Sequence, residues 1–208
     1  MHLYTLLLLM YFCPGQSVTR PEPARPPVNK ALELYNECGL LGVISYEAFN
    51  KCMEGYNHYK PDKHIVAICD FTKESDKKRF IVIDLDSKKI ISQTYVAHGV
   101  NSGDCLATSF SNEKESLKSS LGFYRIGPII QTATHGPSLV LDGLEKGKND
   151  NAREREIIIH SASYVGEEFV RKYGYTGHSH GCPALPAEVM SELIPILSDG
   201  GLLYIFAQ

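Results

Sequence analysis

Residues 157–186 read IIIHSASYVGEEFVRKYGYTGHSHGCPALP and carry a histidine and a cysteine in a setting that suits covalent chemistry. Three isoleucines lead into His160, which predicts a rigid, partly dry position at the end of a buried strand. The stretch ends in a Ser-His-Gly-Cys-Pro run at 179–183. A thiol is nucleophilic only as its thiolate, and a nearby imidazole lowers its pKa and accepts its proton. The pattern therefore predicts Cys182 as nucleophile and His160 as its base.

The residues on either side of Cys182 suit the same chemistry. Gly181 allows a tight turn that presents backbone N–H groups to an oxyanion. Pro183 lacks an N–H and fixes the direction of the chain that leaves the nucleophile. We therefore expect the oxyanion site on the backbone of this run.

Outward from this stretch, the sequence predicts a mainly β domain with a few helices. Runs rich in β-branched and aromatic residues predict strands, and DSKK (86–89) predicts the turn of a hairpin. GLLYIFA (201–207) is almost wholly apolar and predicts a central strand. Short helices are expected at 164–173 and at 187–197, just after Pro186. Strands are predicted within HIVAICDF (64–71), RFIVIDLD (79–86), IISQTYVAHG (90–99), LGFYRI (121–126), SLVLDG (138–143) and EREIIIH (154–160).

The N-terminal part divides into three segments. Residues 3–12 read LYTLLLLMYF, too short to span a bilayer and typical of a signal peptide, so we expect residues 1–17 to direct export and be removed. The alternatives are an uncleaved apolar N-terminus and a lipid anchor at Cys13. Residues 18–27 are a Pro-rich linker. Residues 28–60 predict a helical hairpin, with Gly39 ending the first helix and Ser45 capping the second, and 61–208 form the main domain.

The composition fits one globular domain of ordinary size. Of 208 residues, 43% are apolar and 22% charged, and the formal net charge is -3. The basic residues are scattered, which argues against a nucleic-acid partner. Six cysteines are present; without Cys13 the count is odd, as expected for a free Cys182 beside paired ones. The other four (Cys38, Cys52, Cys69 and Cys105) form either two disulfides or buried thiols, and the sequence leaves both open.

The chain resembles the murein L,D-transpeptidase catalytic domain family, a YkuD-like group with Cys-Pro-Ala after the glycine. In that family a histidine precedes a Ser-His-Gly-Cys run by roughly twenty residues; here His160 precedes Cys182 by 22. Four further blocks match in order across roughly residues 65–190. They are AHGVNSG (97–103), ATSFSN (107–112), SSLGFY (119–124) and HGPSLVLDGLEKGKNDNARER (135–155).

The resemblance implies a β-sandwich-type catalytic domain with its cysteine in a tunnel-like cleft. It implies that the substrate is the peptidoglycan stem peptide. Cys182 would expel the terminal D-alanine and form a thioester, which an amine of a neighbouring stem resolves into a 3-3 crosslink. His180, Gly181 and Cys182 would supply the oxyanion donors, chiefly the N–H groups of the last two. Ser161 would hold the imidazole, and Ser179 belongs to the supporting run.

The resemblance also implies that no cofactor, metal or protein partner is needed, and that carbapenem β-lactams form an adduct with the cysteine. Two positions depart from the family pattern. Ala184 stands where the best-known members carry Arg or Asn, which puts the contacts of that residue in doubt. Ser161 stands where the subgroup often has glycine, but serine still fits the broader family.

Five residues are candidate substrate contacts. Arg125 could bind a carboxylate and Tyr124 could offer a ring face, although a strand-edge charge beside a core aromatic explains them as well. The remaining candidates are His98, His135 and His178; the first two each precede a glycine and could instead be hydrogen-bonded structural histidines. Arg153 and Arg155 are expected to support the loop before the His160 strand.

Three other functions stay open. An L,D-carboxypeptidase would use the same residues but let water take the acyl group. A zinc site could draw on His160, His178, His180 and Cys182, although this spacing is cramped for zinc. A non-catalytic wall-binding module is the third, and the intact cysteine–histidine pair argues against it.

Overall fold

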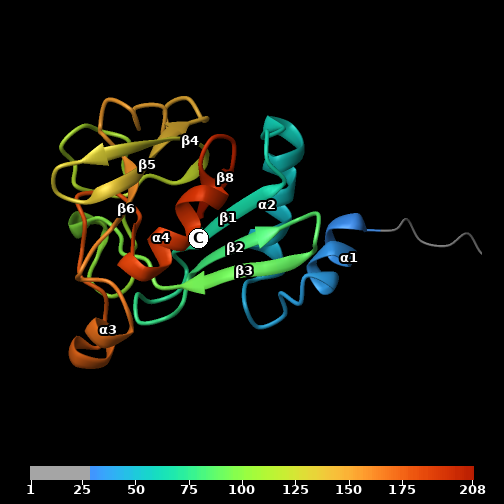
Figure 1. Cartoon of the computed structure of the whole chain (residues 1–208), viewed down its shortest axis with the longest axis horizontal. Coiled ribbons are helices and arrows are strands. Elements are labelled where there is room, and N and C mark those ends of the chain that lie inside the picture. The colour runs from blue at the N-terminus through green and yellow to red at the C-terminus, as the bar shows by residue number, and fades with distance from the viewer. Residues whose placement is uncertain (1–28) are drawn as a thin grey trace, which may run out of the picture.

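The computed structural model describes residues 29–208 (Figure 1). The expected signal peptide (1–17) and Pro-rich linker (18–27) lie outside the described residues. Strands dominate the described part, which confirms the mainly β fold class. No helix in the described part is long and apolar enough to cross a membrane.

Two helices precede the first strand, in the segment where a hairpin is predicted. Helix α1 spans Lys30–Glu37 and α2 spans Tyr46–Tyr59. The Ser45 side chain accepts a hydrogen bond from Ala48 N and caps α2, as expected. Gly39 follows α1 at φ +66°, a conformation that glycine adopts without steric cost. Helix α2 packs on the sheet, and Figure 1 shows both helices at one end of the molecule.

Eight strands join in the order β3-β2-β1-β8-β4-β5-β6-β7. The predicted hairpin at 86–89 connects the antiparallel pair β2 and β3. Strand β8 lies inside the sheet, parallel to β1 and antiparallel to β4, so the prediction of a central C-terminal strand is confirmed. The bounds are β1 Ile65–Asp70, β2 Phe80–Asp84, β3 Lys89–Thr94, β4 Gly122–Thr132, β5 Gly136–Gly143, β6 Ile158–Ser161, β7 Ala184–Leu185 and β8 Leu202–Phe206.

The central strands bury side chains on both faces. In β1, Val66 and Ile68 point to the α1/α2 side, while Ala67 and Cys69 point to a second core. Helix α4 (Ala187–Leu197) covers that second core and contacts β5 and β6. This double burial explains why β1 and β8 read as continuous apolar runs rather than alternating ones. Strand β6, which carries His160, places Ile159 in this second core, while Ile158 and His160 line a cavity.

Helix α4 has the predicted bounds, but two elements are shorter than expected. Helix α3 spans Glu167–Tyr173, because Gly166 at φ +136° stops the chain from being helical earlier. Strand β6 begins at Ile158 rather than near residue 154, because the chain from 149 to 156 is wound into helical turns. A one-turn 3-10 helix, η1, spans Val100–Ser102.

The four cysteines outside the predicted site are all free thiols in the structure. Cys38, Cys52 and Cys69 are buried, and Cys105 is half-exposed. Burial raises the pKa of the Cys52 and Cys69 thiols above the ordinary value. Of the two alternatives left open by the sequence, the structure has free thiols rather than disulfides within residues 29–208.

Candidate active site

His160 lies on β6, between β5 and β7, and is almost fully buried. Its Nδ1 lies 2.9 Å from the Ser161 carbonyl oxygen, so Nδ1 carries the proton and donates it. The Ser161 carbonyl, rather than its hydroxyl, thus holds the ring. Nε2 is left with a free lone pair, as a general base requires. Burial lowers the pKa of His160, and the neighbouring His135 adds to this effect.

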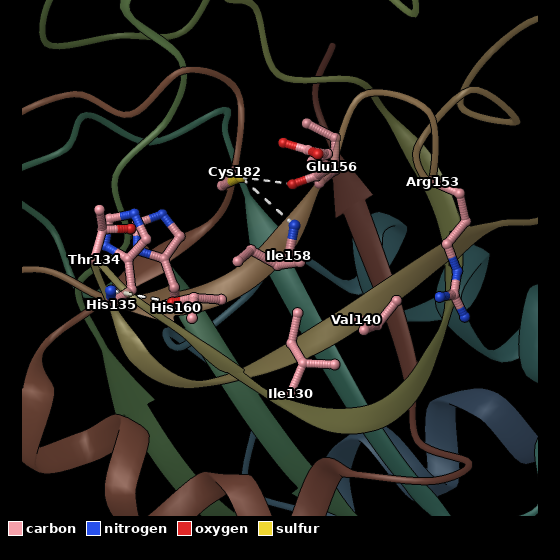
Figure 2. Close-up of a pocket in the computed structure, with 11 residues that line it drawn as sticks. Ile130, Thr134, His135, Val140, Arg153, Glu156, Ile158, His160 and Cys182 are labelled. Carbon is pink, nitrogen blue, oxygen red and sulfur yellow. Dashed lines mark hydrogen bonds between the residues drawn. The ribbon is translucent and has the colours of Figure 1, made fainter.

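His135 stacks on His160, with ring centroids 3.8 Å apart (Figure 2). The Ser161 hydroxyl donates to the His135 carbonyl at 3.2 Å and links the two histidine segments. His135 also lines the cavity that holds Cys182. Of the five candidate substrate contacts, it is the one closest to the predicted base.

The Cys182 thiol is half-exposed and lies between two backbone groups (Figure 2). Ile158 N–H donates to Sγ at 3.5 Å, and the thiol donates to the Glu156 carbonyl at 3.7 Å. Sγ makes no hydrogen bond to His160 in this structure, although both residues line the same cavity. Burial raises the pKa of Cys182, while the Ile158 N–H and the Arg155 cation oppose that rise.

The turn before the thiol depends on glycine and on a serine. Gly181 has φ +123°, and a Cβ there would come within 2.8 Å of the Lys118 carbonyl oxygen. Ser179 Oγ accepts from Gly181 N at 3.1 Å and donates to the Cys182 carbonyl at 2.6 Å. The Gly181 N–H is thus already bonded, contrary to its expected part as a free oxyanion donor. The Cys182 N–H donates to no group in the described part of the chain and remains available.

A serine and an arginine that the sequence analysis did not place at the site hold this turn from outside. Ser119 Oγ donates to the Gly181 carbonyl at 3.1 Å and accepts from Gly99 N at 3.0 Å. The Arg155 guanidinium donates to the Lys118 carbonyl at 2.5 Å and to Ser120 Oγ at 3.1 Å, on either side of Ser119. Arg155 was expected to support the loop before the His160 strand, but its hydrogen bonds hold the segment 111–120 instead. Through Ser119, this segment contacts the turn that carries the predicted nucleophile.

The structure places His98 away from substrate. It is fully buried, its Nδ1 accepts from Arg79 Nη2 at 2.7 Å, and its Nε2 donates to the Gly103 carbonyl at 3.0 Å. Burial and the Arg79 cation lower the pKa of His98 to about 4, so the ring is neutral. Both nitrogens are thus occupied by protein groups, as the structural alternative for His98 expects. His178 Nε2 donates to the Asp104 carbonyl at 2.9 Å, and the ring lines a side pocket next to Cys182.

Two further candidates lie outside the cavities around Cys182. Tyr124 is fully buried, and its hydroxyl donates to the Ser120 carbonyl at 2.9 Å. Arg125, next along β4, points to the other face and pairs with Asp62 at 3.0 Å, outside the cavities around Cys182. Both are explained by the alternation of side chains along a strand.

Two clefts of similar volume meet at Cys182. The first, here called the apolar cleft, has a volume of about 450 Å³ (Figure 2). It is lined by Ile130, Thr132, Thr134, His135, Val140, Arg153, Glu156, Ile157, Ile158, His160 and Cys182. The second, the charged cleft, has a volume of about 440 Å³. It is lined by Lys114, Glu115, Leu117, Glu154, Arg155, Glu156, His180 and Cys182. Reacting groups can therefore approach the thiol from two sides.

The zinc alternative gains no support from the side-chain geometry. Among residues 29–208, no three histidine, cysteine or carboxylate side chains lie close enough together to hold a metal ion. His178 and His180 point into the side pocket, but one is bonded to a backbone carbonyl and the other is exposed. The arrangement instead offers a thiol, a base with a free lone pair and a free backbone N–H, which suits acyl transfer.

Comparison with known proteins gives a family match over most of the chain. A family model described as the L,D-transpeptidase catalytic domain matches residues 42–206. A search of curated proteins finds no match. Similar solved structures include an L,D-transpeptidase from Mycobacterium smegmatis, at 13% identity and a TM-score of 0.41, covering 69% of this chain and 59% of that one.

Two further solved structures are similar. One is an L,D-transpeptidase from Stackebrandtia nassauensis, at 15% identity and a TM-score of 0.41, covering 71% of this chain and 57% of that chain. The other is LD transpeptidase LdtMt1 in complex with imipenem, at 12% identity and a TM-score of 0.41. That match covers 69% of this chain and 59% of the other chain. The match thus spans less than two thirds of each of these chains.

Proposed function

The chain belongs to the L,D-transpeptidase catalytic domain family, and from that membership we propose that it is a peptidoglycan L,D-transpeptidase that forms 3-3 crosslinks through a Cys182 thioester. The observation that carries the proposal is the shared cavity of the Cys182 thiol and a buried His160 whose Nε2 is free. The open Cys182 N–H beside the sulfur adds an oxyanion donor.

In the acylation step, His160 Nε2 takes the thiol proton and Sγ attacks the carbonyl carbon of the third stem residue. The developing oxyanion accepts a hydrogen bond from the Cys182 N–H. Protonated His160 then gives its proton to the nitrogen of the leaving D-alanine, and the C–N bond breaks. The product is a thioester with a neutral imidazole.

In the second step, an amine of a neighbouring stem attacks the thioester carbon. His160 takes a proton from the nitrogen as the C–N bond forms, and the C–S bond then breaks. The same proton returns to the sulfur, so the free enzyme is restored. Water in place of the amine gives the carboxypeptidase reaction. His160 is base and then acid in both steps, which requires a group that is neutral at rest.

The test combines intact-mass analysis with product analysis. The purified protein is mixed with a disaccharide tetrapeptide, alongside Cys182→Ala and His160→Ala variants. We expect a transient thioester mass on the wild type, crosslinked dimer as product, and neither with Cys182→Ala. Release of tripeptide alone would make the protein a carboxypeptidase. A wild type with neither adduct nor product would remove the tetrapeptide assignment.

A β-lactam adduct and export are proposed with this function. Imipenem is the ligand of one similar solved structure, and we expect a carbapenem to acylate Cys182, giving a mass increase of one drug molecule that Cys182→Ala lacks. The apolar segment at 3–12 supports export to the periplasm or cell envelope. Recovery of the protein from the envelope fraction with its N-terminus after Ser17 is the expected result.

A further inference from the structure

Most of the charges around the nucleophile are already bonded to other protein groups. Lys114 lies 3.4 Å from Glu154, and Arg153 forms a two-bond pair with Asp142. The remaining cation, Arg155, donates to loop 111–120. Each of these cations therefore already has a protein partner.

Glu156 is different. Its side chain is exposed, and its carboxylate makes no hydrogen bond or ion pair with any residue in the described part of the chain. It lines both the apolar cleft and the charged cleft. Glu115 is also unpaired, but it lines the charged cleft alone. Glu156 is thus the free carboxylate at the junction of the two clefts.

The backbone fixes Glu156 beside the sulfur. The carbonyl of the same residue accepts the Cys182 thiol at 3.7 Å, and Figure 2 shows Glu156 next to Cys182. Glu156 has φ +55° and ends the helical turns 149–156, with Ile157 N bonded to Ala152 O and Glu156 N to Arg153 O. This is the position at which glycine usually ends a helix, because other residues are strained there. The carboxylate also raises the pKa of Cys182, as expected for a negative charge close to the sulfur.

We propose that Glu156 is a specificity-determining residue that binds the ammonium group of the acyl acceptor and so favours transfer to an amine over hydrolysis. The inference rests on the proposed function and deepens it. A cationic acceptor gains a charge-assisted hydrogen bond to the carboxylate, whereas water gains nothing from it. Held there, the acceptor nitrogen lies within reach of the thioester on Cys182.

Every proton of the acceptor ammonium is accounted for in the transfer step. The bound ammonium loses one proton to solvent and becomes a neutral amine. Its nitrogen attacks the thioester carbon, the C–N bond forms, and His160 Nε2 takes a second proton from the nitrogen. The C–S bond breaks, and His160 returns that proton to Cys182. Glu156 binds the acceptor and takes no part in bond making.

The test measures how the thioester partitions between acceptors. The donor is a disaccharide tetrapeptide with meso-diaminopimelate at its third position, and the acceptor is the same stem, which carries an ammonium group. Hydroxylamine, which is uncharged at neutral pH, is the second acceptor. The ratio of transfer product to hydrolysed tripeptide is measured for wild type, Glu156→Gln and Glu156→Gly. This ratio does not depend on the fraction of folded enzyme, and the glycine variant also relieves the strained φ.

We expect both variants to lower the transfer-to-hydrolysis ratio for the cationic acceptor by about two- to fivefold, the range of an exposed ion pair. The ratio for hydroxylamine should stay unchanged. Glu192→Gln, an exposed position on α4 away from the clefts, is the matched control and should partition like wild type.

An unchanged ratio for the cationic acceptor would overturn the inference and leave the proposed function intact. An equal loss for both acceptors would also overturn it, because Glu156 would then shape the cleft rather than recognise charge. If the wild type forms no thioester at all, the proposed function fails, and this inference fails with it.

Discussion

Replacement of Arg155 by methionine tests whether the loop at 111–120 holds the nucleophile in place. The guanidinium donates to the Ser111 carbonyl at 2.8 Å and to the Lys118 carbonyl at 2.5 Å, with two weaker bonds to Ser116 and Ser120. A hydrogen bond to a charged group contributes about 1.5–3 kcal/mol. Arg155 is half-exposed, which reduces that value. We therefore expect Arg155→Met to lower the free energy of unfolding by about 2–4 kcal/mol.

Arg155→Lys separates the hydrogen bonds from the charge. An ammonium is a point charge that cannot span both carbonyls as the planar guanidinium does, so about half the stability loss should remain. The cation itself should persist and keep opposing the raised pKa of Cys182. The methionine variant loses the cation, so the pKa of its Cys182 thiol should rise, and the rate of Cys182 alkylation by iodoacetamide near neutral pH should fall several-fold. In the lysine variant, which keeps a cation, this rate should fall much less.

The stability assay is urea unfolding followed by far-UV circular dichroism, since the chain has no tryptophan. Arg125→Met is the matched control: its ion pair with Asp62 is exposed and contributes at most about 1 kcal/mol. If Arg155→Met unfolds at the same urea concentration as wild type, the guanidinium does not hold the loop. If the lysine and methionine variants are alkylated equally slowly, the charge has no part in thiol reactivity.

Three other changes have definite expected results. Gly181→Ala should abolish turnover, because its Cβ would meet the Lys118 carbonyl at 2.8 Å and displace Cys182; steady-state assay of a folded variant checks this. Ser119→Ala removes the bonds to Gly99 N and the Gly181 carbonyl in a buried site, so we expect about 1–3 kcal/mol of lost stability and a lower kcat, with KM less affected. His98 has its pKa lowered from 6.5 to about 4. The unfolded chain therefore binds a proton below pH 6.5 that the folded chain binds only near pH 4. The neutral His98 therefore makes its whole contribution to the free energy of unfolding above pH 6.5, and that contribution falls by about 3 kcal/mol as the pH drops to about 4. The free energy of unfolding by urea should depend less on pH in His98→Gln than in wild type.

The elements that the sequence predicted well are those in which a local signal decides the outcome. GLLYIFA is apolar at successive positions, and only a strand buried on both faces suits that pattern. Helix α4 begins directly after Pro186, a residue that favours helix starts. His160 follows three isoleucines, and the structure places it at the end of a buried strand. No long-range contact has to be known for any of these features.

The features that the sequence could not predict depend on contacts between distant parts of the chain. Tyr124 and Arg125 alternate along one strand, but which of them faces the core depends on what packs on each face. His98 looked available because nothing near it in sequence indicates that Arg79 and Gly103 bind its two nitrogens. The strand predicted at 154–160 starts earlier than β6, because the helical turns before it end at Glu156 rather than at a glycine, which is the usual marker of a helix end.

In this structure the predicted nucleophile and its base are both in a neutral resting arrangement. Burial raises the pKa of the Cys182 thiol and lowers that of the His160 imidazole, so both shifts favour the neutral pair over thiolate and imidazolium. The thiol is also bonded to the Glu156 carbonyl rather than to Nε2. In the proposed mechanism, proton transfer requires the Cys182 side chain to leave that carbonyl and turn toward His160. A substrate carbonyl that binds the free Cys182 N–H lies beside the sulfur and stabilises the charge that follows the transfer. If the proposed mechanism holds, we expect the thiol to be weakly reactive until a substrate is in place.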